Sequence, residues 1–150
     1  MEKNSRILIV DDDENIRKTM KAILEDEGYV VDLATTGNEA VEMTQETAYN
    51  IALLDIRLPD MEGVELLKLM KDNVPRTRKI MVTGYPSMQN AISALNKNAD
   101  AYLVKPVDIE KLLNMVKEQL RLQESEREYS EKKVAEFIEA RVKELSLDRT

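Results

Sequence analysis

Cysteine and histidine are both absent from this chain of 150 residues. Without cysteine the chain has no disulfide framework, no thiolate metal site and no cysteine nucleophile. Without histidine it has no histidine-based zinc site, no serine–histidine triad and no side chain that could act as a phosphohistidine donor. If this chain handles phosphate covalently, a carboxylate has to accept it.

Acidic residues outnumber basic ones, and the chain has no long apolar run. The formal net charge is −7 and the isoelectric point is near 4.8, which argues against nucleic acid as a direct partner. No apolar run approaches the roughly 20 residues of a membrane span. The first six residues lead into a strand-like run without the apolar stretch of a signal peptide. We therefore expect a cytoplasmic protein that contacts no membrane.

Glycine and proline occur only four times each, and neither occurs in residues 107–150. Before that tail, short apolar runs alternate with segments of helical periodicity, which gives five β-then-α units. Such alternation predicts an α/β fold whose parallel sheet is covered by helices on both faces. The length suits one domain with a substantial core.

The tail without glycine or proline predicts a helix that Asp108 can cap. An unbroken helix over residues 108–145 would be about 57 Å long, more than the breadth of about 35 Å expected for such a domain. It must therefore project from the domain or bend back. Its later part carries an apolar stripe that comprises Val134, Phe137, Ile138, Val142 and Leu145. We interpret this stripe as a packing or self-association face and not as a membrane helix, because the polar side of the helix mixes Glu with Lys and Arg.

Polar side chains stand where the strand-like runs end. Asp11 and Asp12 follow the first run, Asp55 follows the third, Thr83 ends the fourth and Lys105 follows the fifth. The carboxyl ends of parallel strands meet at one edge of a sheet, so these side chains should lie together. Three carboxylates need a cation to offset their repulsion, and an all-oxygen set favours Mg²⁺. A metal, a lysine and a hydroxyl together indicate phosphate chemistry.

Each of these residues has a plainer interpretation when it is taken alone. The acids at 11–13 could simply cap the next helix, and Asp13 is interpreted only as a cap. Asp55 could be a turn aspartate, and Tyr102 could pack in the core with its hydroxyl at the surface. The combination with Lys105 is what favours a functional site.

Several short motifs stand in a fixed order along the chain. They are Asp11-Asp12, Asp55, residues 58–63, Val82-Thr83-Gly84, residues 99–104 and Lys105-Pro106. In that order they resemble the receiver domain of two-component response regulators over residues 5–122, and the likeness is greatest to receivers of the nitrogen-regulation class. The resemblance implies a flavodoxin-like (βα)5 fold with parallel sheet order 2-1-3-4-5 and an extended C-terminal helix, residues 123–150 being an extension of the receiver. Asn98 stands where the family usually has glycine, which the backbone tolerates.

The resemblance implies that Asp55 accepts a phosphoryl group from a sensor histidine kinase or a phosphotransfer protein. Mg²⁺ would be bound by Asp55 itself, by Asp12 directly, by Asp11 through water and by the backbone carbonyl of Arg57. A carboxylate attacks phosphate poorly unless cations neutralise the charge between them, so the implied roles agree with the residues.

The resemblance also implies a signalling switch and not an enzyme that turns over substrate. Lys105 would contact the phosphoryl oxygens, and Thr83 with Tyr102 would relay the change to the surface and the tail, where two copies could associate. The alternative is a Mg²⁺-dependent aspartyl-phosphate phosphatase or phosphotransferase. Such enzymes commonly need a second acid two residues after the nucleophile, where this chain has Arg57. A pseudo-receiver that only binds partners is disfavoured, because every required side chain is present.

Overall fold

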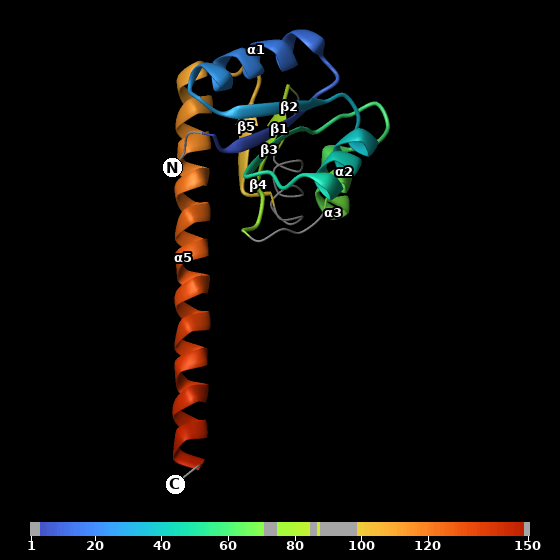
Figure 1. The fold of residues 1–150 in the computed structure, drawn as a ribbon. Coiled ribbons are helices and arrows are strands. Elements are labelled where there is room, and N and C mark those ends of the chain that lie inside the picture. The colour runs from blue at the N-terminus through green and yellow to red at the C-terminus, as the bar shows by residue number, and fades with distance from the viewer. Residues whose placement is uncertain (1–3, 71–74, 85–86, 88–98, 149–150) are drawn as a thin grey trace.

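The computed structural model describes residues 4–70, 75–84, 87 and 99–148, which form a parallel sheet with helices on both faces (Figure 1). The helix of the fourth predicted β-then-α unit, and the Asn98 position, lie outside the described residues. The elements, in chain order, are β1 (Arg6–Val10), α1 (Glu14–Asp26), β2 (Val30–Ala34), α2 (Gly37–Glu46), β3 (Ile51–Asp55), α3 (Gly63–Leu69), β4 (Arg78–Thr83), β5 (Ala101–Val104) and α5 (Ile109–Asp148).

The sheet has the strand order β2-β1-β3-β4-β5, and every neighbouring pair is parallel. The predicted order 2-1-3-4-5 is therefore confirmed. Every residue of β3 and β4 is buried, as expected for strands that are covered by helices on both sides. This burial explains why the sequences of β3 and of the middle of β4 are apolar runs and not alternating patterns.

The sheet separates two apolar cores, and successive residues of β1 point into them in turn. Ile7 and Ile9 lie in the core that α1 and α5 cover. Leu8 and Val10 lie in the core that α2 and α3 cover. Because helices cover both faces of the sheet, the polar residues that follow the strands lie at the end of the sheet, where a site can form.

Local signals in the sequence set the ends of α1. The carboxylate of Asp13 accepts a hydrogen bond from the backbone N–H of Ile16 at 3.1 Å, which confirms Asp13 as the cap. Gly28 follows the helix with φ of 96°, a conformation that favours glycine. α1 is thereby held between the site at the carboxyl end of β1 and the start of β2.

α5 is one continuous helix of 40 residues, and it projects well beyond the rest of the chain (Figure 1). The carboxylate of Asp108 accepts from the N–H of Lys111 at 3.1 Å, so the predicted cap is confirmed. Leu112, Val116 and Leu120 are buried against the sheet, whereas residues 128–147 are exposed. Of the two predicted possibilities, projection is the one observed. Among the described helices, none combines the length and apolarity that crossing a membrane requires.

Candidate functional site

The carboxyl end of the sheet brings three acidic residues together. Asp11 directly follows β1, Asp12 is next to it, and Asp55 is the last residue of the neighbouring strand β3. One carboxylate oxygen from each lies within 4.8 Å of the other two. Asp11 and Asp55 are buried and Asp12 is exposed, so the cluster opens to solvent on the side of Asp12.

Lys105 reaches into this cluster from the end of β5. Its Nζ lies 2.8 Å from Oδ2 of Asp11 and 3.4 Å from Oδ2 of Asp55. Burial lowers the pKa of Lys105, but the hydrogen bond to Asp11 and the charges of both carboxylates outweigh burial and raise the pKa above its usual value. Lys105 is therefore held in its charged form between two carboxylates.

The environment of Asp55 is short of positive charge. Burial raises the pKa of its carboxyl group, the negative charge of Asp11 raises it further, and Lys105 and the N–H of Arg57 only partly oppose this. Lys105 carries one positive charge and so offsets one of the three negative charges. Closely spaced oxygen ligands with excess negative charge match the preference of a hard divalent cation such as Mg²⁺.

The cluster lines a pocket of about 490 Å³ that is open at the surface. The pocket is large enough for a phosphoryl group beside a hydrated cation. Its lining includes both the carboxylates and the lysine, so a ligand in it would contact all the charges at once. The lining residues are Asp11, Asp12, Asp13, Ile16, Asp55, Arg57, Gly84 and Lys105.

Asp11 is held by one contact to its carboxylate and one to its backbone carbonyl. The N–H of Asp13 donates to Oδ1 of Asp11 at 2.9 Å, and the guanidinium of Arg17 donates to the carbonyl of Asp11 at 2.7 Å. Arg17 was not predicted as a site residue, because an arginine in the first turns of a helix has no distinctive sequence pattern. Its role is to orient the acidic pair.

The loop after Asp55 is also tightly held. The N–H of Gly63 donates to the carbonyl of Ile56 at 2.5 Å, and a Cβ on Gly63 would collide with the backbone carbonyl of Asp55. Farther along the loop, Asp60 accepts from the N–H groups of Asn38 and Gly37 at the start of α2, at 2.9 and 2.8 Å. These two bonds lower the pKa of Asp60. The loop therefore holds Asp55 and Arg57 in place.

Thr83 and Tyr102 lie on adjacent strands beside this site. Thr83 is buried at the end of β4, and its carbonyl accepts from the N–H of Lys105 at 2.7 Å. Tyr102 packs against the core beneath α2 and α3. Its hydroxyl is buried and has no hydrogen-bond partner in the part of the chain that the structure describes. The hydroxyl therefore does not reach the surface, and it makes no hydrogen bond to Thr83.

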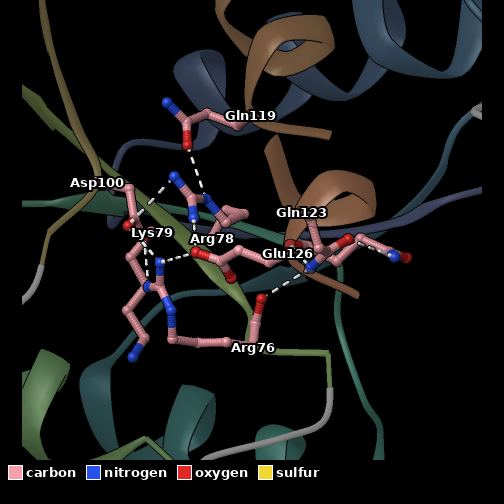
Figure 2. A network of polar contacts seen from close by, with 8 residues as sticks. Arg76, Arg78, Lys79, Asp100, Gln119, Gln123 and Glu126 are labelled. Carbon is pink, nitrogen blue, oxygen red and sulfur yellow. Dashed lines mark hydrogen bonds and ion pairs between the residues drawn. The ribbon is translucent and has the colours of Figure 1, made fainter. Parts of the chain in front are cut away.

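A second polar cluster, which the sequence analysis missed, lies at the opposite end of the strands and joins β4 to α5 (Figure 2). Arg78 donates from Nε to Gln119 at 2.9 Å and from NH1 to Glu126 at 2.8 Å. Arg76 forms two hydrogen bonds with Asp100, at 2.8 and 2.9 Å. We call this cluster the amino-end network; it comprises Arg76, Arg78, Asp100, Gln119, Gln123 and Glu126.

Gln123 completes the amino-end network with its side-chain amide. Its Nε2 donates to the backbone carbonyls of Asn50 at 3.0 Å and Arg76 at 2.8 Å, and its Oε1 accepts from Nδ2 of Asn50 at 2.9 Å. Gln123 is buried, so these bonds are shielded from water. The network fastens α5 to the sheet at the point where the helix leaves the domain.

With this geometry established, comparison with known proteins identifies the family. The family model of the response regulator receiver domain matches residues 7–117. A CheY-like receiver domain protein from Methanospirillum hungatei JF-1 is similar, with a TM-score of 0.77 and 50% identity over 81% of this chain and 98% of that one. The beryllofluoride-activated NtrC4 receiver domain dimer has a TM-score of 0.74 and 36% identity over 82% of this chain and 99% of that one.

A curated relative is longer than this chain. The transcriptional regulatory protein ZraR of Klebsiella oxytoca is 39% identical over 122 residues, which cover 79% of this chain but only 28% of ZraR. The expectation that nucleic acid is not a partner is unsupported, because this relative regulates transcription. The likeness to NtrC4 and ZraR confirms the predicted similarity to nitrogen-regulation receivers. The chain belongs to the response regulator receiver family, the aspartate-phosphorylated domains of two-component signalling.

Proposed function

We propose that Asp55 is the aspartate that accepts the phosphoryl group from a sensor histidine kinase or a phosphotransfer protein. The observation that carries this assignment is that Asp55 is buried at the end of β3, next to both the acidic pair and Lys105. A carboxylate oxygen of Asp55 attacks the phosphorus of the donor's phosphohistidine, and an O–P bond forms as the N–P bond breaks. The electron pair stays on the imidazole nitrogen, and the product is an aspartyl phosphate.

We infer that Mg²⁺ would be held directly by Asp12, Asp55 and the backbone carbonyl of Arg57, and through water by Asp11. The bound ion supplies charge neutralisation for the incoming phosphoryl oxygens. Lys105 supplies a further positive charge, since its Nζ already lies 3.4 Å from Asp55. The loop anchored by Gly63 orients Asp55 and Arg57 so that both face the same pocket.

We propose that Thr83 and Tyr102 relay phosphorylation to the surface. Thr83 is connected to the site because its carbonyl accepts from the N–H of Lys105. Tyr102 holds a buried hydroxyl without a hydrogen-bond partner among the described residues, which costs roughly 1–3 kcal/mol. A second position of the Tyr102 side chain in which the hydroxyl is solvated would remove this cost. Phosphorylation would change the balance between the two positions.

We further propose that residues 5–122 act as the receiver and that residues 123–150 form an output extension through which two copies associate. The solved NtrC4 receiver domain is a dimer by its description, and ZraR regulates transcription. A switch that serves transcription would act in the cytoplasm. Turnover of exogenous phosphate esters is not expected, because Arg57 occupies the position where such enzymes commonly carry a second acid, and the relatives are regulators.

The assignment of Asp55 is tested by incubating the protein with acetyl phosphate and Mg²⁺ and measuring its intact mass. Wild type should gain the mass of one phosphoryl group, and Asp55→Asn should gain none. Asp26→Asn is the matched control, because Asp26 is exposed at the end of α1 and outside the acidic cluster, and it should be phosphorylated like wild type. Full phosphorylation of Asp55→Asn would show that the acceptor lies elsewhere.

The relay is tested with Thr83→Ala. This variant keeps the carboxylates and Lys105, so it should still be phosphorylated by acetyl phosphate. Its output, measured as the change in self-association on phosphorylation, should be lost. Thr77→Ala offers a control threonine that is buried at the other end of the sheet. An unchanged response in Thr83→Ala would refute the relay.

A further inference from the structure

The projecting part of α5 carries a row of exposed apolar side chains that no described residue of the domain covers. We call this row the tail stripe; it comprises Val134, Ile138, Val142 and Leu145. Each of these side chains is between 54% and 57% exposed. The row is spaced 4, 4 and 3 residues apart, which keeps it on one face of the helix. A continuous apolar row of this kind marks an interaction surface.

The tail stripe lies on the same face of α5 that packs against the sheet. The buried positions Leu112, Val116, Leu120 and Gln123 have the same 4, 4, 3 spacing as the stripe. Two repeats of 11 residues turn the helix by a residual angle of only about 40° at 3.6 residues per turn. The tail stripe therefore faces the side of α5 on which the domain lies. Figure 1 shows that α5 projects past the sheet with the domain on one side of it.

The amino-end network makes this orientation a fixed property of the molecule. Gln123 donates to the backbone carbonyls of Asn50 and Arg76, which precede β3 and β4, and Glu126 binds Arg78 at 2.8 Å. α5 is therefore held as far as residue 126. The helix then continues without a break to Asp148. The stripe cannot rotate away from the domain side unless these bonds break or the helix unwinds.

We infer that the tail stripe is covered by the tail of a second copy in antiparallel orientation. A parallel second helix packed on the stripe would lie on the domain side of α5. Paired helices cross at a small angle, so the N-terminal half of that second helix would stay close to the first helix. It would then overlap the volume that the sheet and core of the first copy occupy. In an antiparallel pair the N-terminal half of the second helix points away from the first domain. The second domain therefore lies beyond the C-terminal end of the first helix. The inference rests on the self-association proposed above and specifies its geometry.

The antiparallel arrangement also matches side chains along the tail. Val134 of one copy faces Leu145 of the second copy, and Ile138 faces Val142, so the whole stripe is paired with itself. The segment from Arg127 to Asp148 is about 32 Å long at 1.5 Å per residue, which gives each domain room beyond the other copy's helix end.

The absence of cysteine allows a direct test by disulfide trapping in the full chain. Val134→Cys and Leu145→Cys are made separately and oxidised mildly, alone and as an equal mixture. In the antiparallel pair, positions 134 of the two copies are about 17 Å apart along the axis, beyond the reach of a disulfide. Either variant alone should therefore give no covalent dimer, and the mixture should convert up to half of its dimers. Glu136→Cys, on the opposite helix face, is the control and should give none in any combination.

Three other results would overturn the inference. Covalent dimer from Val134→Cys alone and from Leu145→Cys alone would show parallel pairing. A dimer in sedimentation without trapping in the mixture would show that another surface is used. A monomer at all concentrations, with and without acetyl phosphate, would show that the stripe has a different occupant. Phosphorylation of Asp55 is read separately by mass, so it can hold when the dimer fails.

Discussion

The two ends of the sheet both collect charged side chains, but they balance charge differently. At the carboxyl end, three carboxylates lie within 4.8 Å of one another and Lys105 offsets one of them. In the amino-end network, Arg76 and Arg78 are matched by Asp100 and Glu126, with amide groups completing the hydrogen bonds (Figure 2). The first arrangement is incomplete without a ligand, and the second is complete by itself.

The difference teaches that imbalance of charge, and not the number of charged residues, separates a binding site from a structural cluster. Asp55 has a raised pKa because burial and Asp11 both disfavour its charge. In the network, the pKa of Arg76 is raised by its hydrogen bond to Asp100, which means the pair favours the charged form. Removing a charge should therefore have opposite effects at the two ends.

The largest expected effect is at the amino end. Arg78→Ala leaves Gln119 without its partner and leaves Glu126 with only the 3.4 Å contact to Arg76. It should lower the free energy of unfolding by about 3 kcal/mol, the low end for a broken buried pair because Glu126 is half exposed. Urea denaturation measures the change. Arg121→Ala is the control, because Arg121 pairs with Glu118 on the surface, where water and salt screen the pair, and its loss should leave the free energy of unfolding nearly unchanged. Equal effects of the two substitutions would show that the network is not a structural clamp.

At the carboxyl end, adding Mg²⁺ should stabilise the protein. With a dissociation constant of about 1 mM, 10 mM Mg²⁺ should raise the free energy of unfolding by about 1.4 kcal/mol. Asp12→Ala removes one carboxylate of the cluster and should lose most of this gain, whereas Arg78→Ala should keep it. A full Mg²⁺ effect in Asp12→Ala would place the metal outside the cluster.

Asp55→Asn should stabilise the protein in buffer without Mg²⁺, by on the order of 1 kcal/mol. The raised pKa of Asp55 means that its negative charge lowers the free energy of unfolding. This loss is absent at low pH and appears as pH rises through the folded pKa. The advantage of the variant should be greatest near neutral pH and shrink below the ordinary aspartate pKa of about 4. Denaturation of both proteins from acid to neutral pH measures this difference. A variant that is less stable than wild type at neutral pH would contradict the charge imbalance.

The sequence predicted the carboxyl-end cluster and missed the network for one physical reason. Asp11, Asp55 and Lys105 each follow an apolar run, and parallel strands necessarily bring such positions together. The network instead joins residues such as Arg78 and Glu126 that are 48 positions apart. No periodicity relates them, so their contact appears only when α5 is placed on the sheet.

Some signals in the sequence could have indicated the network. Gln123 stands in line with the apolar positions of α5, and a polar residue at such a place needs a buried hydrogen-bond partner. Arg78 begins a strand whose other residues are mostly apolar, which is unusual for a long charged side chain. For the tail, periodicity predicted a helix, but whether it would project or fold back depended on this anchoring.

The central claim is that the carboxyl end is the responsive end and the amino end is a fixed anchor. Hydrogen exchange measured with and without beryllofluoride, which mimics the phosphoryl group on an aspartate, tests it in one experiment. The account predicts altered protection at Thr83 and around Tyr102–Lys105, with unchanged protection at residues 76–79 and 119–126. Altered protection of the amino-end network with an unchanged carboxyl end would contradict it.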